Sequence, residues 1–445
     1  MGRLKQFIGQ VLGFDGFRVK AWYWEKPSGV QFQRVSRFVV PTDARLVVAV
    51  ERVWMGHCVG CGRRCRKVHE RTKKRRWQDL PWSEHPVAIE YAPDRLFCRH
   101  CQQARVEMLP WADPYQRETR RLQQHMALDA QSMPTSHVAV RYGLHWHTVR
   151  RAEREALQRW LNTRPKTALE MVGLDEKYLG RRGRFASRYV TIVSNLQTGE
   201  PLWIGYGRSE ATVEQWLLTL SESDKAAIKL FASDMHQAFF NAVKSDQALA
   251  HAVFTHDPFH IIKRANAALD ELRRETFFRA GAEMRALGRG KRWLYLRAWE
   301  NCSPQQQADL KRFLAGNDKL ARARQVVDEL RGVLGAPDRL TMSIGLNHVL
   351  TRTARRGNVP MRKLHDSLSD HYLEIVALGE LHPPTGRIEA LNNNWETLVR
   401  QARGYRNLQD LLLKLRFQTV NPIASVDGLG RFLALGLPTP YAKAA

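Results

Sequence analysis

Two Cys-x-x-Cys pairs, Cys58/Cys61 and Cys98/Cys101, constrain the N-terminal part of the chain more than any other feature. Two cysteines three positions apart can reach one metal ion from a single tight turn, and two such turns complete a tetrahedral site of four thiolates. Four protein ligands leave no open position, so such a site is structural. A zinc ion there supplies folding free energy on the order of 10 kcal/mol. We therefore predict one structural zinc ion; incidental buried cysteines and a redox role are the alternatives.

The compartment expected from the sequence is the cytoplasm. The N-terminus lacks the apolar segment of a signal peptide, and no apolar run approaches the roughly 18–20 residues that span a bilayer. In a cytosolic chain, clustered cysteines favour metal binding over disulfides. Cys65 is a spare cysteine beside the two pairs, and Cys302 is isolated.

The charge balance points to a polyanionic partner. The chain has 70 Lys and Arg against 44 Asp and Glu, a net charge of +26. Neutralising phosphates releases counterions, so nucleic acid is the first candidate. No basic amphipathic helix favours a membrane surface, and a chain that is merely basic is the remaining alternative. Within the cysteine module, Lys73, Lys74, Arg75 and Arg76 are candidates for phosphate contact, or else form a solvated face.

Residues 134–157 have the layout of a helix-turn-helix. Gly143 can adopt the positive φ that the turn needs, and the small Ala139 allows the two helices to approach closely. Arginine can pair with guanine in the major groove, and histidine can contact phosphates or base edges. The alternative is a helical hairpin with a charged surface. The residues expected to face DNA are His145, Trp146, His147, Arg150, Arg151 and Arg154.

From about residue 168 strands and helices follow one another. Strands are expected at 168–175, 188–194, 201–206, 228–233 and 251–256. Three strands in a meander, followed by strands that alternate with helices, imply a mixed α/β sheet. No P-loop and no dinucleotide-binding glycine pattern occurs, so no nucleotide cofactor is expected.

Three carboxylates stand at the ends of separate elements. Asp175 and Asp234 each end an apolar strand, and Glu389 lies near the start of a late helix. Three such acids suit a site with two Mg²⁺ ions, because hard cations prefer carboxylate oxygen and two ions can serve both the attacking and the leaving oxygen of a phosphoryl transfer. On spacing alone each acid could equally be a helix cap or a loop acid. Asp257 precedes Pro258, the arrangement of a helix N-cap followed by a first-turn proline.

Ordered blocks over about residues 45–420 resemble the ISL-three family of insertion-sequence transposases, within the DDE superfamily. After the first Cys-x-x-Cys pair come VHERTKKRRWQDLPW and RLFCRHC, then the helix-turn-helix and LDEKYLGRRGRFASRYVTIVSNLQTGE. FASDMHQAF, HDPFHIIKRANAALDELRR and IEALNNNWETLVRQARGYRN follow. The resemblance implies that Asp175, Asp234 and Glu389 form the metal-binding triad, and it places Asp257 and His260 near the site in supporting roles. Lys263, Arg264 and Arg403 are expected to contact phosphates, with salt bridges to nearby acids as the alternative.

The fold class that follows is a multidomain α/β protein in which a zinc-binding module and a helix-turn-helix precede an RNase H-like catalytic core with a helical insertion. The expected parts are the zinc module at 1–110, the helix-turn-helix at 115–165, the first part of the core at 168–274, the insertion at 275–385, and the last catalytic helix with the tail at 386–445.

The function expected from the resemblance is DNA transposition. The protein would bind the terminal inverted repeats of its element, cut the element ends, and join the freed 3′ hydroxyls to target DNA. Two ends must be handled together, so a homodimer or higher assembly on double-stranded DNA is expected, associated with the nucleoid. A catalytically silent DNA-binding regulator derived from a transposase and a nuclease of the same fold are the alternatives.

Overall fold

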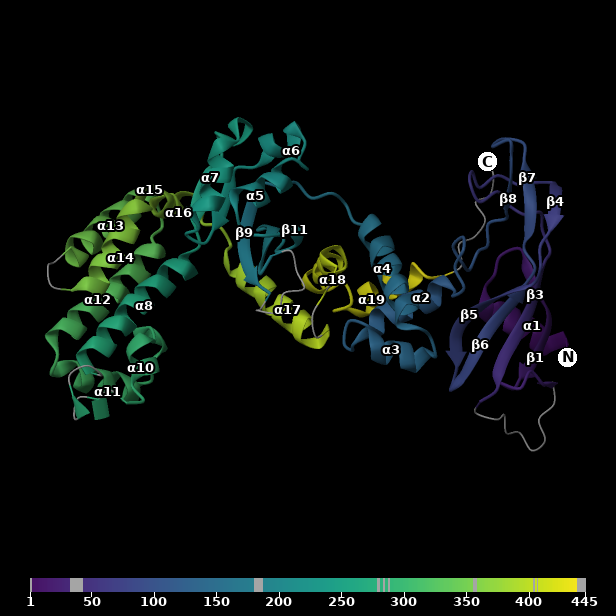
Figure 1. Cartoon of the computed structure of the whole chain (residues 1–445), viewed down its shortest axis with the longest axis horizontal. Helices are drawn as coiled ribbons and strands as arrows, with labels where there is room; N and C mark the ends of the chain where they lie inside the picture. Colours follow the sequence, from purple (N-terminus) through teal and green to yellow (C-terminus); the bar gives the residue numbers. More distant parts are fainter. Residues whose placement is uncertain are drawn as a thin grey trace. The chain divides into compact units, whose positions relative to one another are not determined.

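The computed structural model describes residues 2–32, 43–179, 187–277, 281–282, 285–286, 289–354, 358–402, 405 and 407–437. The chain divides into two compact units. The first comprises Met1–Pro165, Leu398–Tyr405 and Asn421–Ala445, and the second comprises Lys166–Thr397 and Arg406–Val420. Each unit is described by itself below (Figure 1).

The first unit contains two sheets and a group of helices. Its strands are β1 (Phe17–Glu25), β2 (Gln31–Phe32), β3 (Arg45–Arg52), β4 (Lys67–Arg71), β5 (Arg75–Trp82), β6 (His85–Tyr91), β7 (Asp94–Cys98) and β8 (Gln103–Val106). Its helices are α1 (Gly2–Leu12), α2 (Arg120–Asp129), α3 (Thr135–Tyr142), α4 (Trp146–Asn162) and α19 (Val426–Ala434).

The larger sheet of this unit has the order β2-β1-β3-β6-β5. Its core gathers apolar residues of β1, β3, β5, β6 and α1 around the buried Trp111. Trp111 meets the rings of Phe14, Phe17, Trp77 and Tyr91 at centroid distances of 4.6–5.9 Å. Such aromatic pairs add stability beyond their buried area. Helix α1 and strand β1 were not expected from the sequence, whose first 45 residues show no clear pattern.

The smaller sheet, β4-β7-β8, carries the cysteine pairs. The second pair begins at Cys98, the last residue of β7, and the first lies in the turn before β4. The buried core here is small: Cys58, Cys65, Leu96 and Cys98. Because so little apolar surface is buried, this sheet depends on an additional source of stability.

Helices α2, α3 and α4 form the predicted helix-turn-helix region. Gly143 ends α3 with φ +61°, and His145 caps α4 through a hydrogen bond from the His147 N–H. Val138, Ala139 and Val149 are buried between the helices. The turn requires the left-handed conformation at Gly143, where a Cβ would be strained.

The second unit begins with a five-stranded sheet and its helices. Its strands are β9 (Met171–Tyr178), β10 (Tyr189–Asn195), β11 (Pro201–Tyr206), β12 (Leu230–Ser233) and β13 (Val253–His256). The helices up to the insertion are α5 (Glu210–Leu217), α6 (Glu222–Ala227), α7 (Gln237–Ser245), η2 (Gln247–Leu249) and α8 (Pro258–Phe277). The later ones are α10 (Arg292–Leu296), η3 (Trp299–Asn301), α11 (Pro304–Ala315), α12 (Asp318–Leu334), α13 (Arg339–Thr353), α14 (Val359–Asp370), α15 (Tyr372–Val376), α16 (Leu378–Leu381), α17 (Gly386–Ala402) and α18 (Leu408–Val420).

The sheet of the second unit is mixed, with the order β11-β10-β9-β12-β13. β9, β10 and β11 form an antiparallel meander, and β12 and β13 run parallel to β9. This agrees with the meander and alternation expected from the sequence. The carboxyl ends of β12 and β13 therefore lie level with the middle of β9, which continues to Tyr178 beside β10.

Different helices cover the two faces of this sheet. On one face, Leu174 and Phe231 join a core with residues of α5 and α7. On the other, Ile388 of α17 packs on Leu230 and Ala232. Gly173 permits this close packing, because a Cβ at that position would lie 3.3 Å from the Ile388 side chain and only 2.7 Å from Leu196.

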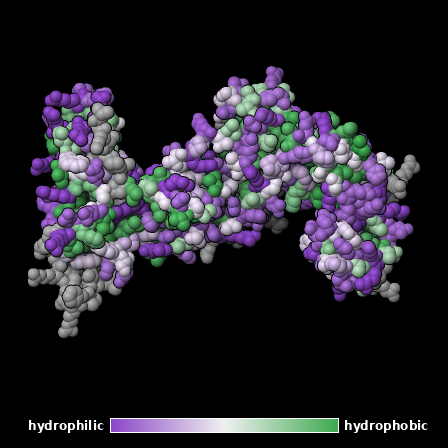
Figure 2. Space-filling view, turned by 180° about the vertical axis from the view of Figure 1, so that it is seen from behind, coloured by the Kyte–Doolittle hydropathy of each residue, from purple (hydrophilic) through white to green (hydrophobic). Residues whose placement is uncertain are grey.

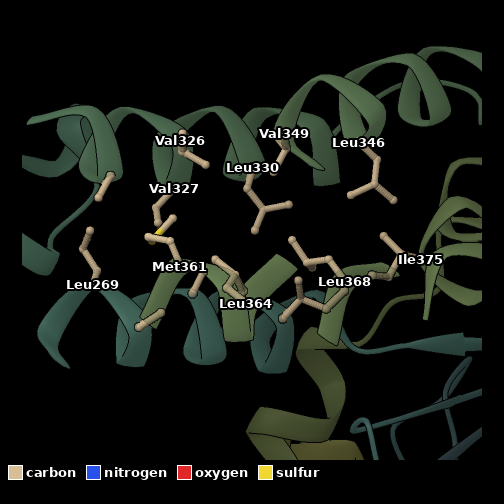
Figure 3. Packing of buried hydrophobic residues seen from close by; sticks show 14 of the residues in the cluster. Leu269, Val326, Val327, Leu330, Leu346, Val349, Met361, Leu364, Leu368 and Ile375 are labelled. Carbon is tan, nitrogen blue, oxygen red and sulfur yellow. The ribbon is translucent and has the colours of Figure 1, made fainter. Parts of the chain in front are cut away.

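The segment between β13 and α17 is mainly helical, as predicted. Its core joins α8, α12, α13, α14 and α15 through a large set of buried aliphatic side chains (Figure 3). Hydrophilic residues cover much of the surface seen in Figure 2. Among the described residues, no helix is long and apolar enough to cross a membrane.

Candidate functional site

The sheet register aligns three aspartates at the edge where β12 and β13 end. Asp175 does not end its strand, as the sequence suggested, because β9 continues to Tyr178 through its pairing with β10. Ser233 of β12 pairs with Leu174 of β9 and with His256 of β13. The next residue on each strand is an aspartate. In order across the sheet these are Asp175, Asp234 and Asp257. Neighbouring strands lie about 4.8 Å apart, so the three carboxylates form a row.

The row lies on the face of the sheet that α17 covers. Side chains alternate along a strand, and Gly173 and Ala232 both face Ile388 of α17. Asp175 and Asp234 stand two positions further along the same strands. The same alternation along β13 puts the third aspartate on this face. All three aspartates therefore lie on the face of the sheet that is covered by α17, the helix that carries Glu389.

Asp234, in the middle of the row, is the most perturbed of these acids. Burial, and then the charges of Asp175 and Glu176, raise its pKa to about 7, against the partial relief that Arg264 gives. Its Oδ1 atom is buried and accepts no hydrogen bond. A buried carboxylate oxygen without a donor, surrounded by other acids, fits a site for a hard cation.

The outer two aspartates have partial compensation. Asp175 lies 3.2 Å from Lys177 Nζ and accepts the Glu176 N–H. Asp257 accepts the Phe259 N–H at 3.0 Å and so caps α8, as the Asp-Pro sequence predicted. Burial nevertheless raises the pKa of Asp257.

Two further groups adjoin Asp257. His260 Nε2 lies 4.0 Å from its Oδ2, and burial lowers the pKa of this histidine. Thr385, immediately before α17, hydrogen-bonds the same carboxyl and lowers its pKa. The supporting residues named from the resemblance therefore lie in the row or beside it.

Glu389 is less closely associated with the row. It is exposed in the first turn of α17, four residues after Thr385. Among the described residues, neither Asp175, Asp234 and Glu389 nor the three aspartates of the row form a group whose ligand atoms all lie within 4.8 Å of one another. A cation shared by three of these acids would therefore require their carboxylates to move closer together. Glu176 points elsewhere, to Arg208 at 3.1 Å.

The basic residues expected near this site differ in their surroundings. Lys263 is exposed on α8. Arg264 donates to Ser367 Oγ at 3.0 Å and to the Met235 carbonyl at 3.2 Å, beside Asp234. Arg403 lies outside the described residues.

The four paired cysteines form one group in the first unit. Their sulfur atoms all lie within 4.8 Å of one another; Cys58 and Cys101 are 3.9 Å apart, and Cys61 and Cys98 are 3.6 Å apart. Four ligands at a tetrahedral Zn–S distance of about 2.3 Å stand about 3.8 Å apart. The Cys101 N–H lowers the pKa of the Cys98 thiol, which favours the thiolate that binds zinc. Cys65 lies beside this group and not in it.

The second helix of the helix-turn-helix exposes only some of the residues named for it. His145, Trp146, His147 and Arg154 are exposed. Arg150 is half-buried over the Tyr405 ring. Arg151 is half-buried, where it pairs with Glu118. The ion pair with Glu118 engages Arg151 within the protein, which the sequence did not indicate.

The basic run of the cysteine module is also divided. Lys73 is exposed, while Lys74 pairs with Glu90 at 3.1 Å. Arg76 pairs with Glu25 at 2.8 Å and with Glu90 at 3.1 Å. Arg75 faces a cleft of about 910 Å³, a feature that the sequence did not indicate. The other cationic residues of this cleft are Arg95, Arg105, Arg117 and Arg120.

From the sequence, Asp257 was expected only in a supporting role near the site. The structure places it in the row, level with Asp234. The signal was available, because Asp234 and Asp257 each directly follow a short buried strand, as Asp175 follows the apolar run MVGL. What the sequence lacked was the register that sets these strand ends side by side.

Comparisons with known proteins agree with this architecture. Residues 172–415 match a family model described as a transposase, and residues 107–156 match the helix-turn-helix domain of transposase family ISL3. The transposase for insertion sequence element IS1001 of Bordetella parapertussis is 29% identical over 93% of this chain and 97% of its own length. The transposase for IS1557 of Mycobacterium tuberculosis is 24% identical over 80% of this chain and 84% of its own. Because the transposase model covers more than half of a chain that also carries the family's helix-turn-helix, the protein belongs to the ISL3 family of transposases.

Proposed function

We propose that this chain is an active DDE transposase, which cuts the ends of its insertion sequence and transfers them to target DNA. The observation that carries the proposal is the aspartate row at the edge of the mixed sheet, with an unpaired buried oxygen on Asp234. The mixed sheet, interrupted by a helical segment before α17, supports the assignment of an RNase H-like core. In this proposal the core comprises residues 168–274 and the last catalytic helix, and residues 275–385 are the helical insertion between them.

In this proposal the carboxylates serve to hold metal ions in position. Asp175 and Asp234 would hold divalent cations on the α17 side of the sheet, with Glu389 completing the set and Asp257 beside it. Bound Mg²⁺ would neutralise the phosphate and lower the barrier to in-line displacement at phosphorus. Lys177 and Arg264 offset the charge of the row and keep its geometry when no cation is present. No residue of the row needs to form a covalent intermediate.

DNA binding belongs to the first unit in this proposal. The exposed Trp146, His147 and Arg154 on α4 would read the terminal repeats, and Lys73 and the Arg75 cleft would contact phosphates. A zinc ion on the four cysteines would stabilise the β4-β7-β8 sheet. Two element ends must be cut and joined together, so the working form is a dimer or higher assembly on nucleoid DNA.

The test is a cleavage and joining assay on labelled DNA that carries the element's own ends, with Mg²⁺. Asp234→Asn and Glu389→Gln should each lower the cleavage rate at least about 100-fold, because each removes charge stabilisation that acts in the transition state. Both variants should still bind the ends.

Glu396→Gln is the matched control, since it makes the same change seven residues further along α17. It should leave cleavage unchanged. End binding without cleavage by any of the proteins would favour the silent regulator. Nicking without joining would favour a nuclease.

A further inference from the structure

A second group of metal-ligand side chains lies where the mixed sheet meets the helical segment. His256 ends β13, His371 lies between α14 and α15, and Glu374 is in α15. One ligand atom from each lies within 4.8 Å of those of the other two. The group shares no residue with the aspartate row. It combines residues that are more than a hundred positions apart, so the fold alone brings them together.

The spacing of the two histidines suits a shared zinc ion. His256 Nε2 and His371 Nδ1 are 3.1 Å apart. Two nitrogen ligands at about 2.05 Å on a tetrahedral zinc stand about 3.3 Å apart. A direct hydrogen bond between the rings would fit the same distance, but it would leave the Glu374 carboxylate without a function. Two histidines and one carboxylate are a common zinc set, with the fourth position open.

Both histidines are withdrawn from solvent: the His256 side chain is buried at 1% exposure, and His371 is half-buried. The Nδ1 atom of His256 is buried without a hydrogen-bond partner among the described residues, and its Nε2 atom lies 3.1 Å from His371 Nδ1.

The surroundings provide charge balance and rigidity. Arg264 lowers the pKa of both rings, while Glu374 and Asp370 act on His371 in the opposite sense. The neighbouring Ile375 points into the helical core (Figure 3). α15 is therefore held on its apolar side by packing and presents Glu374 toward β13.

We propose that His256, His371 and Glu374 bind a zinc ion that fastens the helical segment to the carboxyl end of β13. The ion would stand one residue from Asp257 and would hold this end of the row in place. The site is separate from the four-cysteine group and does not depend on the proposed catalytic function.

The test is a metal titration of the full-length protein, first stripped of metal. Added Co²⁺ should fill two classes of site: one with the intense near-ultraviolet bands of thiolate ligation, and one with only weak visible bands. Zinc content after gel filtration should be one equivalent lower in His371→Ala than in wild type. Glu374→Gln should bind the same zinc at least about tenfold more weakly.

His348→Ala is the control, because His348 is an exposed histidine in the same helical segment. It should keep the wild-type zinc content. The proposal is overturned if wild-type protein shows only the thiolate class of cobalt site, or if His371→Ala and wild type hold the same zinc. Excess Mg²⁺ in the titration occupies the oxygen ligands of the aspartate row, so the second class of cobalt site then reports on the histidines even if a variant fails to fold.

Discussion

Replacing Asp234 by asparagine should inactivate the protein and also stabilise its metal-free fold. Burial and neighbouring acids move the pKa of this carboxyl from its ordinary 3.8 to about 7. A tenfold change in an acid constant corresponds to about 1.4 kcal/mol, so above pH 7 the charged form costs the folded state up to about 4 kcal/mol. Asparagine has nearly the same shape and carries no charge, so it removes this cost.

The sign of the pH dependence follows from the same shift. Because the folded-state pKa is raised, the contribution of Asp234 to stability is fully present below about pH 4. It is lost as the pH rises through about 7. In a chelator, thermal unfolding of the second unit should therefore show a higher midpoint for Asp234→Asn than for wild type at pH 8, by up to about 8–16 °C at the usual 2–4 °C per kcal/mol for a unit of this size. At pH 5 the difference should shrink.

With Mg²⁺ present, wild type should have the higher unfolding midpoint, since the cation binds and stabilises the charged row of wild type and binds the variant only weakly. Differential scanning fluorimetry with and without Mg²⁺ gives the four unfolding midpoints, two for wild type and two for Asp234→Asn. Asp246→Asn is the control, because Asp246 pairs with Lys225 at 2.8 Å and its loss should destabilise the fold. If Asp234→Asn lowers the midpoint at pH 8 in chelator, the account of a strained acidic row is wrong.

Three other changes test the remaining parts of the structure. Cys61→Ser should reduce bound zinc by one equivalent and expose the β4-β7-β8 sheet to limited proteolysis, and unchanged zinc content would exclude the four-cysteine site. Gly143→Val should destabilise the helix-turn-helix by about 1–2 kcal/mol because φ is +61° there, which urea unfolding can measure; an equal loss for the exposed Val140→Ala would count against the reason given. Leu330→Ala, in the core of the helical segment, should cost about 2–5 kcal/mol in unfolding free energy, and a loss below 1 kcal/mol would mean that this core is loosely packed.

The sequence by itself determined much of the local structure. The Cys-x-x-Cys spacing indicated the four-sulfur group, since two short turns can supply two ligands each. Gly143 indicated the turn of the helix-turn-helix, because few other residues adopt its φ. The strand expected at 201–206 coincides with β11, and apolar runs followed by an acid made Asp175 and Asp234 candidates, which the family resemblance then favoured. All of these are properties of neighbours along the chain.

Only the tertiary structure decided which distant residues meet. Strand register places Asp257 level with Asp234, and packing of Ile388 on Gly173 and Ala232 puts α17 on the face of the row. Internal ion pairs engage Arg76 and Arg151, which the basic run and the helix-turn-helix layout assigned to DNA. His256 and His371 come together only through the helical segment. Pairing and packing between elements depend on the whole chain, because the sequence around one residue does not specify which distant residue it will contact.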